Sequence, residues 1–249
     1  MSHTTVLNRL RALGKVQKVG KWVPHKLSEI NIAQRLSTCI FLSSRQKKKS
    51  FLWKIVTGDE KWLYYDNPVN KKQWLSPCQA LFSIPKPGVH RKKVMLCVWW
   101  DQMGIIYYEI LEPKQTVTAN LYLQQLMRLS LALETKRPYR GKGKRKVILL
   151  HDNARPHVAK TTRETIENLG WEVLPHPAYS PDLAPSDYCL FRSMEHFFRE
   201  KSFSDFDGIK KDVAQFFSCK PASFFEKGIQ SLTERWKKFI ASDGNYFDD

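Results

Sequence analysis

The sequence predicts an α/β fold in which a mixed five-stranded sheet is flanked by helices. Short apolar runs rich in Val, Ile, Leu and Trp recur, as expected for strands, at residues 51–56, 94–100, 105–111, 147–150 and 171–174. Longer stretches with apolar residues at helical spacing lie between the later strands and after the last one. Hydrophobic residues make up 42% of the chain, which is enough for a packed core and argues against wholesale disorder.

The N-terminal part of the chain precedes the predicted sheet and divides into short segments. Residues 2–13 have the spacing of a helix that is too small to be a domain, and residues 15–25 are basic and linker-like. A second helix is predicted for residues 26–44, and a basic break for residues 45–50. We therefore expect three units along the chain, namely residues 1–14, 15–50 and 51–249.

The remaining elements follow in an order typical of one large domain. Residues 61–65 continue the first strand or begin its partner, and the next two strands form a hairpin around the sequence DQMG. Residues 66–92 are irregular, and a long loop in a compact domain is usually functional. A helix is expected at 119–133 and a flexible basic loop at 136–146, and the chain is helical in pattern beyond residue 191.

The charge of the chain predicts a polyanionic partner. Its 41 Lys and Arg against 24 Asp and Glu give a net charge of +17. An anionic membrane would require a basic amphipathic helix or a lipid anchor, and the sequence shows neither, nor an apolar run of transmembrane length. Five cysteines without Cys-x-x-Cys spacing indicate reduced thiols in an intracellular protein and no zinc knuckle.

Three carboxylates follow predicted strands in a pattern that suggests metal chemistry. Asp59 ends the first strand, Asp152 follows the fourth, and Asp187 lies on the helix after the fifth. This order is a ribonuclease-H-like arrangement. Hard cations such as Mg²⁺ take oxygen ligands and keep several waters, and two of them about 4 Å apart can clamp the attacking and leaving oxygens of a phosphodiester.

Other interpretations of the same residues remain open at this point. A single Asp in a loop is more often a turn former or a helix cap, and Asp182 competes with Asp187 for the third position. His151 and His157 around Asp152 suggest zinc, although Arg155 interrupts the tight ligand spacing that zinc sites prefer. The chain has neither a Gly-x-Ser-x-Gly elbow nor a P-loop, so acyl transfer and NTP hydrolysis have no motif support.

Several long motifs make the sequence resemble the mariner branch of the Tc1/mariner DNA transposases. The resemblance covers nearly the whole chain, through KVQKVGKWVPH, VTGDEKW, MLCVWWDQMGIIYYEIL, LHDNARPHVA, WEVLPHPAYSPDLAPSDYCLF and ERWKKFIASDGNYF. The third acid of that family lies 34 residues after the second, and here 34 residues separate Asp152 from Asp187. The resemblance therefore selects Asp187 over Asp182 and implies a catalytic triad of Asp59, Asp152 and Asp187.

The resemblance implies a cut-and-paste DNA transposase with the ribonuclease-H-like fold of the DDE/DDD transposases and integrases. Such an enzyme uses two Mg²⁺ or Mn²⁺ ions held by the triad. It cuts double-stranded DNA at terminal inverted repeats and joins the freed ends to TA target sites. It is implied to work in the nucleus as a homodimer, with no membrane and no small-molecule substrate. Residues 66–92 would form the clamp loop that reaches the partner subunit.

The sequence departs from the family pattern at two places. Family members carry two helix-turn-helix units ahead of the linker, whereas residues 1–14 resemble only a remnant of the last recognition helix. An idle, truncated or domesticated DNA-binding relic is therefore the alternative, and a nuclease for RNA–DNA hybrids is a further one. Cys189 stands where the family often has His, two residues after Asp187, which would alter metal geometry or a nearby DNA contact.

Candidate DNA-contact residues come from the basic clusters, the linker and the neighbourhood of the triad. Phosphate binding requires Lys and Arg, and an exposed aromatic ring can stack on a base. The alternatives are a solvated loop or nuclear-localisation signal for the basic runs, core packing for Trp62, and helix capping for Arg155 and His157. The candidates are Lys21, Trp22, His25, Trp62, Arg91, Lys92, Lys93, Lys142, Lys144, Arg145, Arg155 and His157.

Overall fold

A computed structural model describes residues 25–68, 91–138 and 146–246 of the chain. Several predictions fall outside these residues. They are the helix at 2–13, most of the expected clamp loop, and the DNA-contact candidates Lys21, Trp22, Lys142, Lys144 and Arg145. Within the described residues, no helix is long and apolar enough to cross a bilayer.

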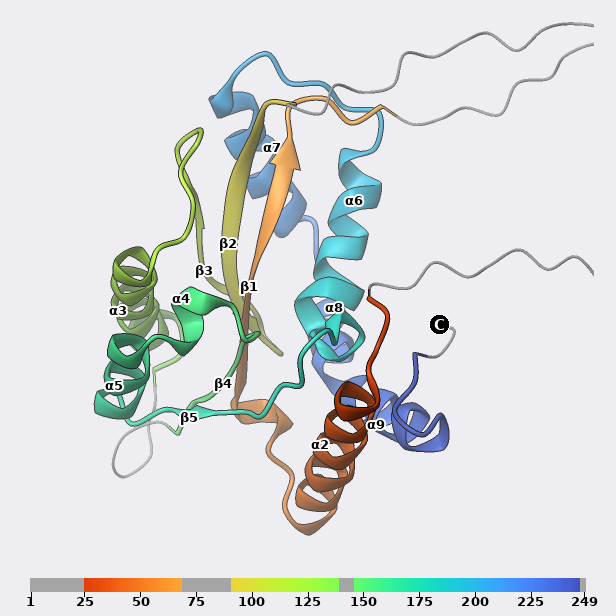
Figure 1. The fold of residues 1–249 in the computed structure, drawn as a ribbon. Coiled ribbons are helices and arrows are strands. Elements are labelled where there is room, and N and C mark those ends of the chain that lie inside the picture. The colour runs from red at the N-terminus through yellow and green to blue at the C-terminus, as the bar shows by residue number, and fades with distance from the viewer. Residues whose placement is uncertain (1–24, 69–90, 139–145, 247–249) are drawn as a thin grey trace, which may run out of the picture.

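The centre of the molecule is a mixed sheet with the strand order β3-β2-β1-β4-β5 (Figure 1). The first three strands form an antiparallel meander, and β4 and β5 continue the sheet parallel to β1. The strands are β1 (Ile55–Tyr64), β2 (Lys93–Asp101), β3 (Gly104–Ile110), β4 (Ile148–Leu150) and β5 (Glu172–Val173). The predicted five-stranded mixed sheet and its hairpin are confirmed.

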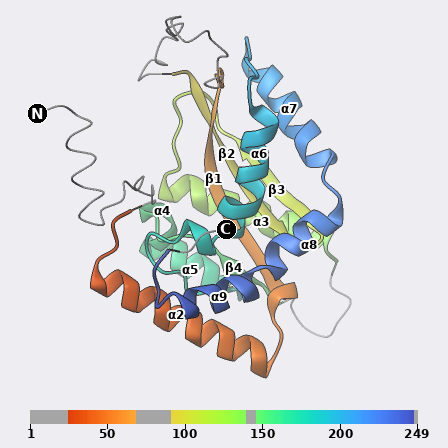
Figure 2. The same ribbon diagram turned by 90° about the vertical axis from the view of Figure 1, so that its right-hand side faces the viewer.

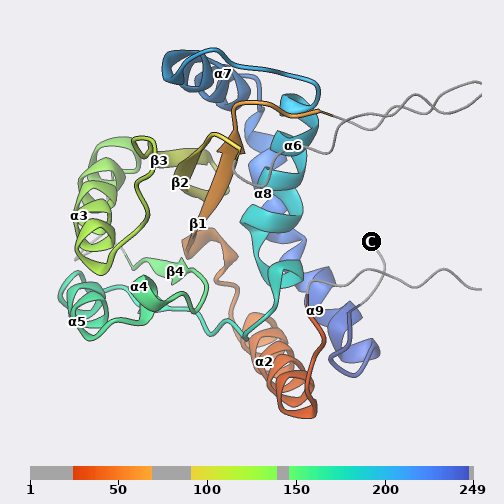
Figure 3. The same ribbon diagram turned by 45° about the horizontal axis from the view of Figure 1, so that its top comes forward.

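Helices cover both faces of the sheet (Figures 1 and 3). One face carries α3 (Ala119–Lys136), α4 (Arg155–Val158) and α5 (Lys160–Asn168). The other face carries α2 (Glu29–Lys48), α6 (Arg192–Phe198), α7 (Phe206–Ser218), α8 (Ala222–Gln230) and α9 (Leu232–Ala241). Although α2 and α9 come from opposite ends of the described chain, they pack against each other (Figure 2).

The two faces have separate hydrophobic cores, which the alternation of β2 divides. Trp99 points to the cluster beneath α3, together with Val56 and Tyr122. Its neighbour Trp100 points to the cluster beneath α8 and α9, together with Phe225. Both tryptophans are fully buried. Side chains of successive strand residues point to opposite faces, so adjacent tryptophans can anchor both layers at once.

Two predicted boundaries are wrong. The helix was expected to end before residues 45–50, but α2 continues to Lys48. Arg45 pairs with Glu172, and basic residues suit the C-terminal end of a helix. The first strand begins at Ile55 and runs without a break to Tyr64, so residues 61–64 continue it and do not begin its partner. Phe51 and Leu52 are buried in a 3₁₀ turn, and an apolar run alone does not distinguish such a turn from a strand.

The shortness of β4 creates a crevice in the sheet. β4 pairs with β1 only from Ile55 to Thr57, and the last pair joins Thr57 to Leu150. Beyond this pair the two parallel strands separate, although β1 continues to Tyr64. Ligand sites of α/β sheets form where neighbouring strands diverge in this way.

Candidate active site

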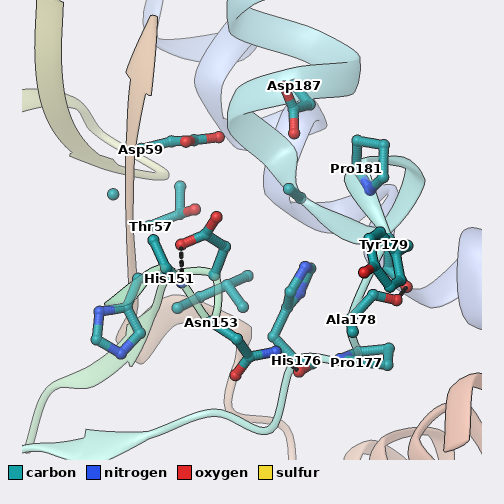
Figure 4. Close-up of a pocket in the computed structure, with 16 residues that line it drawn as sticks. Thr57, Asp59, His151, Asn153, His176, Pro177, Ala178, Tyr179, Pro181 and Asp187 are labelled. Atoms are coloured by element: carbon teal, nitrogen blue, oxygen red, sulfur yellow. Dashed lines mark hydrogen bonds between the residues drawn. The ribbon is translucent and has the colours of Figure 1, made fainter. Parts of the chain in front are cut away.

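The sheet register places two of the predicted acids side by side. Asp59 and Asp152 each lie two residues beyond the last β1–β4 pair, Thr57 and Leu150. Asp187 approaches from the opposite side of the crevice, on the helical segment Ser186–Phe191 (Figure 4). All three carboxylates line one cavity of about 450 Å³.

A π-helical turn presents Asp187 to this cavity. The turn spans Ser186–Phe191 and continues directly into α6. The indole of Trp100 donates a hydrogen bond of 3.1 Å to the Ser186 hydroxyl, and the Tyr188 hydroxyl donates one of 2.8 Å to the Gly228 carbonyl. Single π turns inside helices often occur at functional sites. Here the turn fixes two neighbours of Asp187 against the core while its carboxylate remains at the cavity.

The three carboxylates titrate differently because their surroundings differ. Burial, the charge of Asp187 and the charge of Glu60 raise the pKa of Asp59 well above its usual value. Burial also raises the pKa of Asp187 to about 6, with Lys61 opposing. Burial would raise the pKa of Asp152 as well, but hydrogen bonds from His157 and the Ala154 amide lower it overall.

This charge pattern fits a site for hard divalent cations. Carboxylates that repel one another across a shared cavity are stabilised in their charged form by a cation, and Mg²⁺ and Mn²⁺ prefer oxygen ligands. As the described side chains stand, no three His, Cys, Asp or Glu residues converge closely enough to enclose a metal ion by themselves. Ions at this cavity would therefore take further ligands from water or substrate, as Mg²⁺ ordinarily does.

The ring of His157 is buried and supports Asp152. Its side chain is 2% exposed. Its Nδ1 lies 2.7 Å from Asp152 Oδ1, and its Nε2 lies 3.2 Å from Glu60 Oε1. Burial favours the neutral ring, but the two carboxylates outweigh burial and raise the pKa of His157 to about 10. This burial argues against the predicted contact of His157 with DNA, since the ring lies beneath the carboxylate.

The remaining described DNA-contact candidates lie on the surface or at its edge. Arg155 and Lys92 are exposed. Trp62 is only half-buried and belongs to neither core cluster, so it is not a core residue. Lys93 Nζ lies 4.1 Å from the centre of its ring. Arg91 lies over the ring of Tyr64 at 5.2 Å. The ring of His25 stacks on Tyr179 at 3.8 Å.

Residues that the sequence analysis missed contribute to the site. Glu60 follows Asp59 and holds the second nitrogen of His157. His176 lines the cavity, and burial lowers the pKa of its imidazole to about 4. Its position next to Asp152 depends on a hydrogen bond of 2.8 Å from the Asn153 side chain to the His176 carbonyl. No spacing in the sequence distinguishes His176 from an ordinary loop histidine.

Two residues near the third acid make contacts that the sequence did not predict. Asp182 lies in the 3₁₀ turn Pro181–Leu183, and its carboxylate binds the guanidinium of Arg35 through two hydrogen bonds of 3.0 and 3.1 Å. The Cys189 sulfur packs beside α8, where a methyl group added to Gly228 would lie 2.9 Å from it. Burial raises the pKa of this thiol to about 11. Cys189 therefore contacts α8, although the sequence suggested an effect on the metal site.

Comparisons with known proteins agree with this geometry. Residues 64–142 match the family described as Transposase (partial DDE domain). The mariner Mos1 transposase of Drosophila mauritiana is 51% identical over 248 residues, which cover 100% of this chain and 72% of the relative. The human histone-lysine N-methyltransferase SETMAR is 41% identical over 255 residues, which cover 100% of this chain and 36% of that protein.

Solved structures give the same result. A pre-cleavage Mos1 transpososome matches with a TM-score of 0.91 and 53% identity, over 99% of this chain and 72% of that one. The catalytic domain of Mos1 mariner transposase matches with a TM-score of 0.79 and 50% identity, over 91% of this chain and 100% of that one. The ribonuclease-H-like fold predicted from the element order is thereby confirmed. The chain belongs to the mariner family of transposases.

Proposed function

We propose that this protein is a metal-dependent DNA transposase that cuts DNA at terminal inverted repeats and joins the ends to TA target sites. The observation that carries the proposal is the convergence of Asp59, Asp152 and Asp187, from three separate elements, on one cavity in a chain of this family. Residues 51–249 form the catalytic domain in this proposal, with residues 66–92 as the clamp loop, residues 15–50 as a basic linker and helix, and residues 1–14 as part of a recognition helix.

In the proposed mechanism the three carboxylates would hold two Mg²⁺ or Mn²⁺ ions. When bound, such ions would activate the attacking oxygen and stabilise the leaving oxygen of a phosphodiester. The chain itself holds Asp152 ready as a charged ligand through His157 and the Ala154 amide, which donate hydrogen bonds of 2.7 and 2.9 Å to Oδ1. The Glu60 amide donates to Asp59 Oδ1 over 2.7 Å and fixes that carboxylate in turn.

The proposed partners are double-stranded DNA and a second copy of this chain, with action in the nucleus. The Mos1 relatives were solved as a paired-end complex with transposon-end DNA and as a strand transfer complex, and also with Mn or Mg. The net charge of +17 supports binding to DNA phosphates. Proposed contacts are Lys21, Trp22, His25, Trp62, Arg91, Lys92, Lys93, Lys142, Lys144, Arg145 and Arg155.

The proposal is tested with purified protein, duplex DNA carrying the terminal repeats of a related mariner element, and either Mg²⁺ or Mn²⁺. We expect strand cleavage by the wild-type chain and none by Asp152→Ala, because a proposed metal ligand is lost. Asp207→Asn is the matched control, since that carboxylate is 89% exposed on α7. Unchanged cleavage by Asp152→Ala would overturn the proposal. Salt-sensitive DNA binding without any cleavage would favour a DNA-binding relic instead.

A further inference from the structure

A buried cation on α2 is bound to the loop that leads to the third acid. Arg35 is 0% exposed. Its Nη1 donates hydrogen bonds to the Ser180 hydroxyl, the Tyr179 carbonyl and Asp182 Oδ1, at 2.9, 3.2 and 3.1 Å, and its Nη2 donates to Asp182 Oδ2 at 3.0 Å. Its Nε donates to the carbonyl of Gly244 at 2.9 Å. One guanidinium thus joins α2, the 179–182 loop and the C-terminal segment.

Aromatic rings enclose the same guanidinium. The rings of Phe239 on α9 and Tyr246 each lie 4.4 Å from the central carbon of Arg35. The hydroxyl of Tyr246 donates a hydrogen bond of 2.8 Å to the carbonyl of Tyr179, which also accepts from Arg35. Arginine suits this position better than lysine, because its planar group can bind a carboxylate with two hydrogen bonds while stacking on rings.

The loop held by Arg35 has a backbone conformation that needs support. Tyr179 has a φ of 54°, in the left-handed region that is uncommon for residues other than glycine. Residues in such conformations persist when their surroundings determine them strongly. The two hydrogen bonds to the Tyr179 carbonyl and the ring of His25 stacked on its side chain supply that support.

A short and rigid connection leads from this loop to Asp187. The Leu183 amide bonds to the Ser180 carbonyl, and the Asp187 amide bonds to the Ala184 carbonyl. Leu183 is 3% exposed, and Pro181 and Pro185 restrict the backbone within the connection. A displacement of Asp182 would therefore be transmitted to the π turn that presents Asp187.

We propose that Arg35, acting through Asp182, is a positioning residue that sets the place of the Asp187 carboxylate relative to Asp59 and Asp152. Arg35 does not line the cavity, so it does not touch the reacting groups itself. The inference rests on the proposed function, because it requires Asp187 to be a metal ligand. Residues that orient metal ligands typically change metal affinity by about 10–100-fold when they are replaced.

The test measures Mn²⁺ binding to the full chain by isothermal titration calorimetry, together with hydrogen–deuterium exchange of residues 179–190 in metal-free protein. We expect Arg35→Met and Asp182→Asn each to weaken Mn²⁺ binding by about 10–100-fold and to accelerate exchange in this segment. The double variant should bind Mn²⁺ no more weakly than the single variant with the lower affinity, since both changes remove the same Arg35–Asp182 interaction. The Mn²⁺ affinity of Arg35→Lys should lie between those of the wild type and Arg35→Met.

Leu42→Ala separates positioning from general stability. Leu42 lies on the same helix and is 3% exposed, but it contributes to the core and not to the loop. We expect this variant to melt at a lower temperature with unchanged Mn²⁺ affinity and unchanged exchange at residues 179–190. If Arg35→Met unfolds the chain, Asp182→Asn alone tests the positioning role, because asparagine removes the charge of Asp182 and keeps the shape of its side chain.

The two possible failures are distinguishable. Absence of Mn²⁺ binding by the wild-type chain would contradict the proposed function, and exchange at residues 179–190 would then decide the role of Arg35 as an anchor of the loop. Wild-type Mn²⁺ affinity in both Arg35→Met and Asp182→Asn would overturn the positioning role. Equal weakening of Mn²⁺ binding by Leu42→Ala would also overturn it.

Discussion

Gly58 shows how one residue without a side chain shapes the candidate site. It lies in β1 directly before Asp59, opposite Trp99 of β2. A Cβ atom at this position would lie 2.3 Å from Cδ1 and Nε1 of the Trp99 indole. Trp99 is fully buried and its ring stacks on Tyr107 at 5.7 Å, so it has no free space to move into. The close approach therefore requires glycine at residue 58.

We predict that Gly58→Ala lowers the free energy of unfolding by about 1–3 kcal/mol, which is the usual cost of overpacking a core. Urea denaturation followed by circular dichroism measures the change. Gly208→Ala is the matched control, because its added methyl would meet only the Asp205 carboxylate at 3.2 Å and the Phe203 ring at 3.6 Å. Equal stability of Gly58→Ala and the wild type would show that the Trp99 indole repacks freely.

At the scale of single elements, α3 illustrates how a local signal sets the position of a structural layer. The helix begins at Ala119, and the Thr118 hydroxyl accepts a hydrogen bond of 3.2 Å from the Leu121 amide. Its apolar face then buries Tyr122 and Leu126 against the sheet. The Tyr122 hydroxyl lies 2.8 Å from His151 Nδ1, which ties α3 to the strand end that carries Asp152.

We expect Thr118→Ala to lower the free energy of unfolding by about 1 kcal/mol, since an unsatisfied amide remains at the start of the helix. Thr135→Ala on the same helix is the matched control. Its hydroxyl donates to the Leu131 carbonyl, which already belongs to the helical ladder, so its removal should change stability much less. Chemical denaturation of the two variants side by side makes the comparison, and equal losses would contradict the capping role.

The sequence did not predict the π turn at Ser186–Phe191. The sequence predicted that Asp187 lies on the helix after the fifth strand. The extra residue in the turn follows from two tertiary hydrogen bonds, which hold Ser186 to Trp100 and Tyr188 to Gly228. Those partners are 86 and 40 residues away in sequence, so no local pattern could reveal the turn.

At the scale of the whole molecule, the net charge of +17 dominates the expected interaction with DNA. We predict that affinity for a duplex of arbitrary sequence falls by about 10³–10⁵ between 50 and 200 mM salt, the range for about six to ten phosphate contacts. Fluorescence anisotropy across a salt series measures this fall. The physical reason is the release of condensed counterions when Lys and Arg neutralise phosphates.

Substitution of two neighbouring lysines tests where DNA phosphates contact the molecule. Lys92→Ala with Lys93→Ala should reduce the salt slope by about two, because each lost phosphate contact lowers it by about one. Lys237→Ala is the control, since Lys237 is 62% exposed on α9 and already pairs with Glu234. An unchanged slope in the double variant would remove both lysines from the DNA surface.

The sequence by itself determined the fold class, the succession of strands along the chain and the family. Apolar runs and their spacing are local properties, and the hairpin at β2–β3 and the amphipathic α3 follow from them directly. The 34-residue interval between Asp152 and Asp187, which matches the family pattern, selected the third acid. The net charge likewise indicated a polyanionic partner.

Only the tertiary structure decided how the acids are supported. The ring of His157, a DNA-contact candidate, is buried and holds Asp152 together with Glu60. Asp182 lies in the turn Pro181–Leu183, and its carboxylate also binds Arg35. The contacts of Arg35 with this loop join residues about 145 positions apart. Such contacts depend on which faces meet when the helices pack on the sheet, and no period or spacing within a segment encodes that meeting.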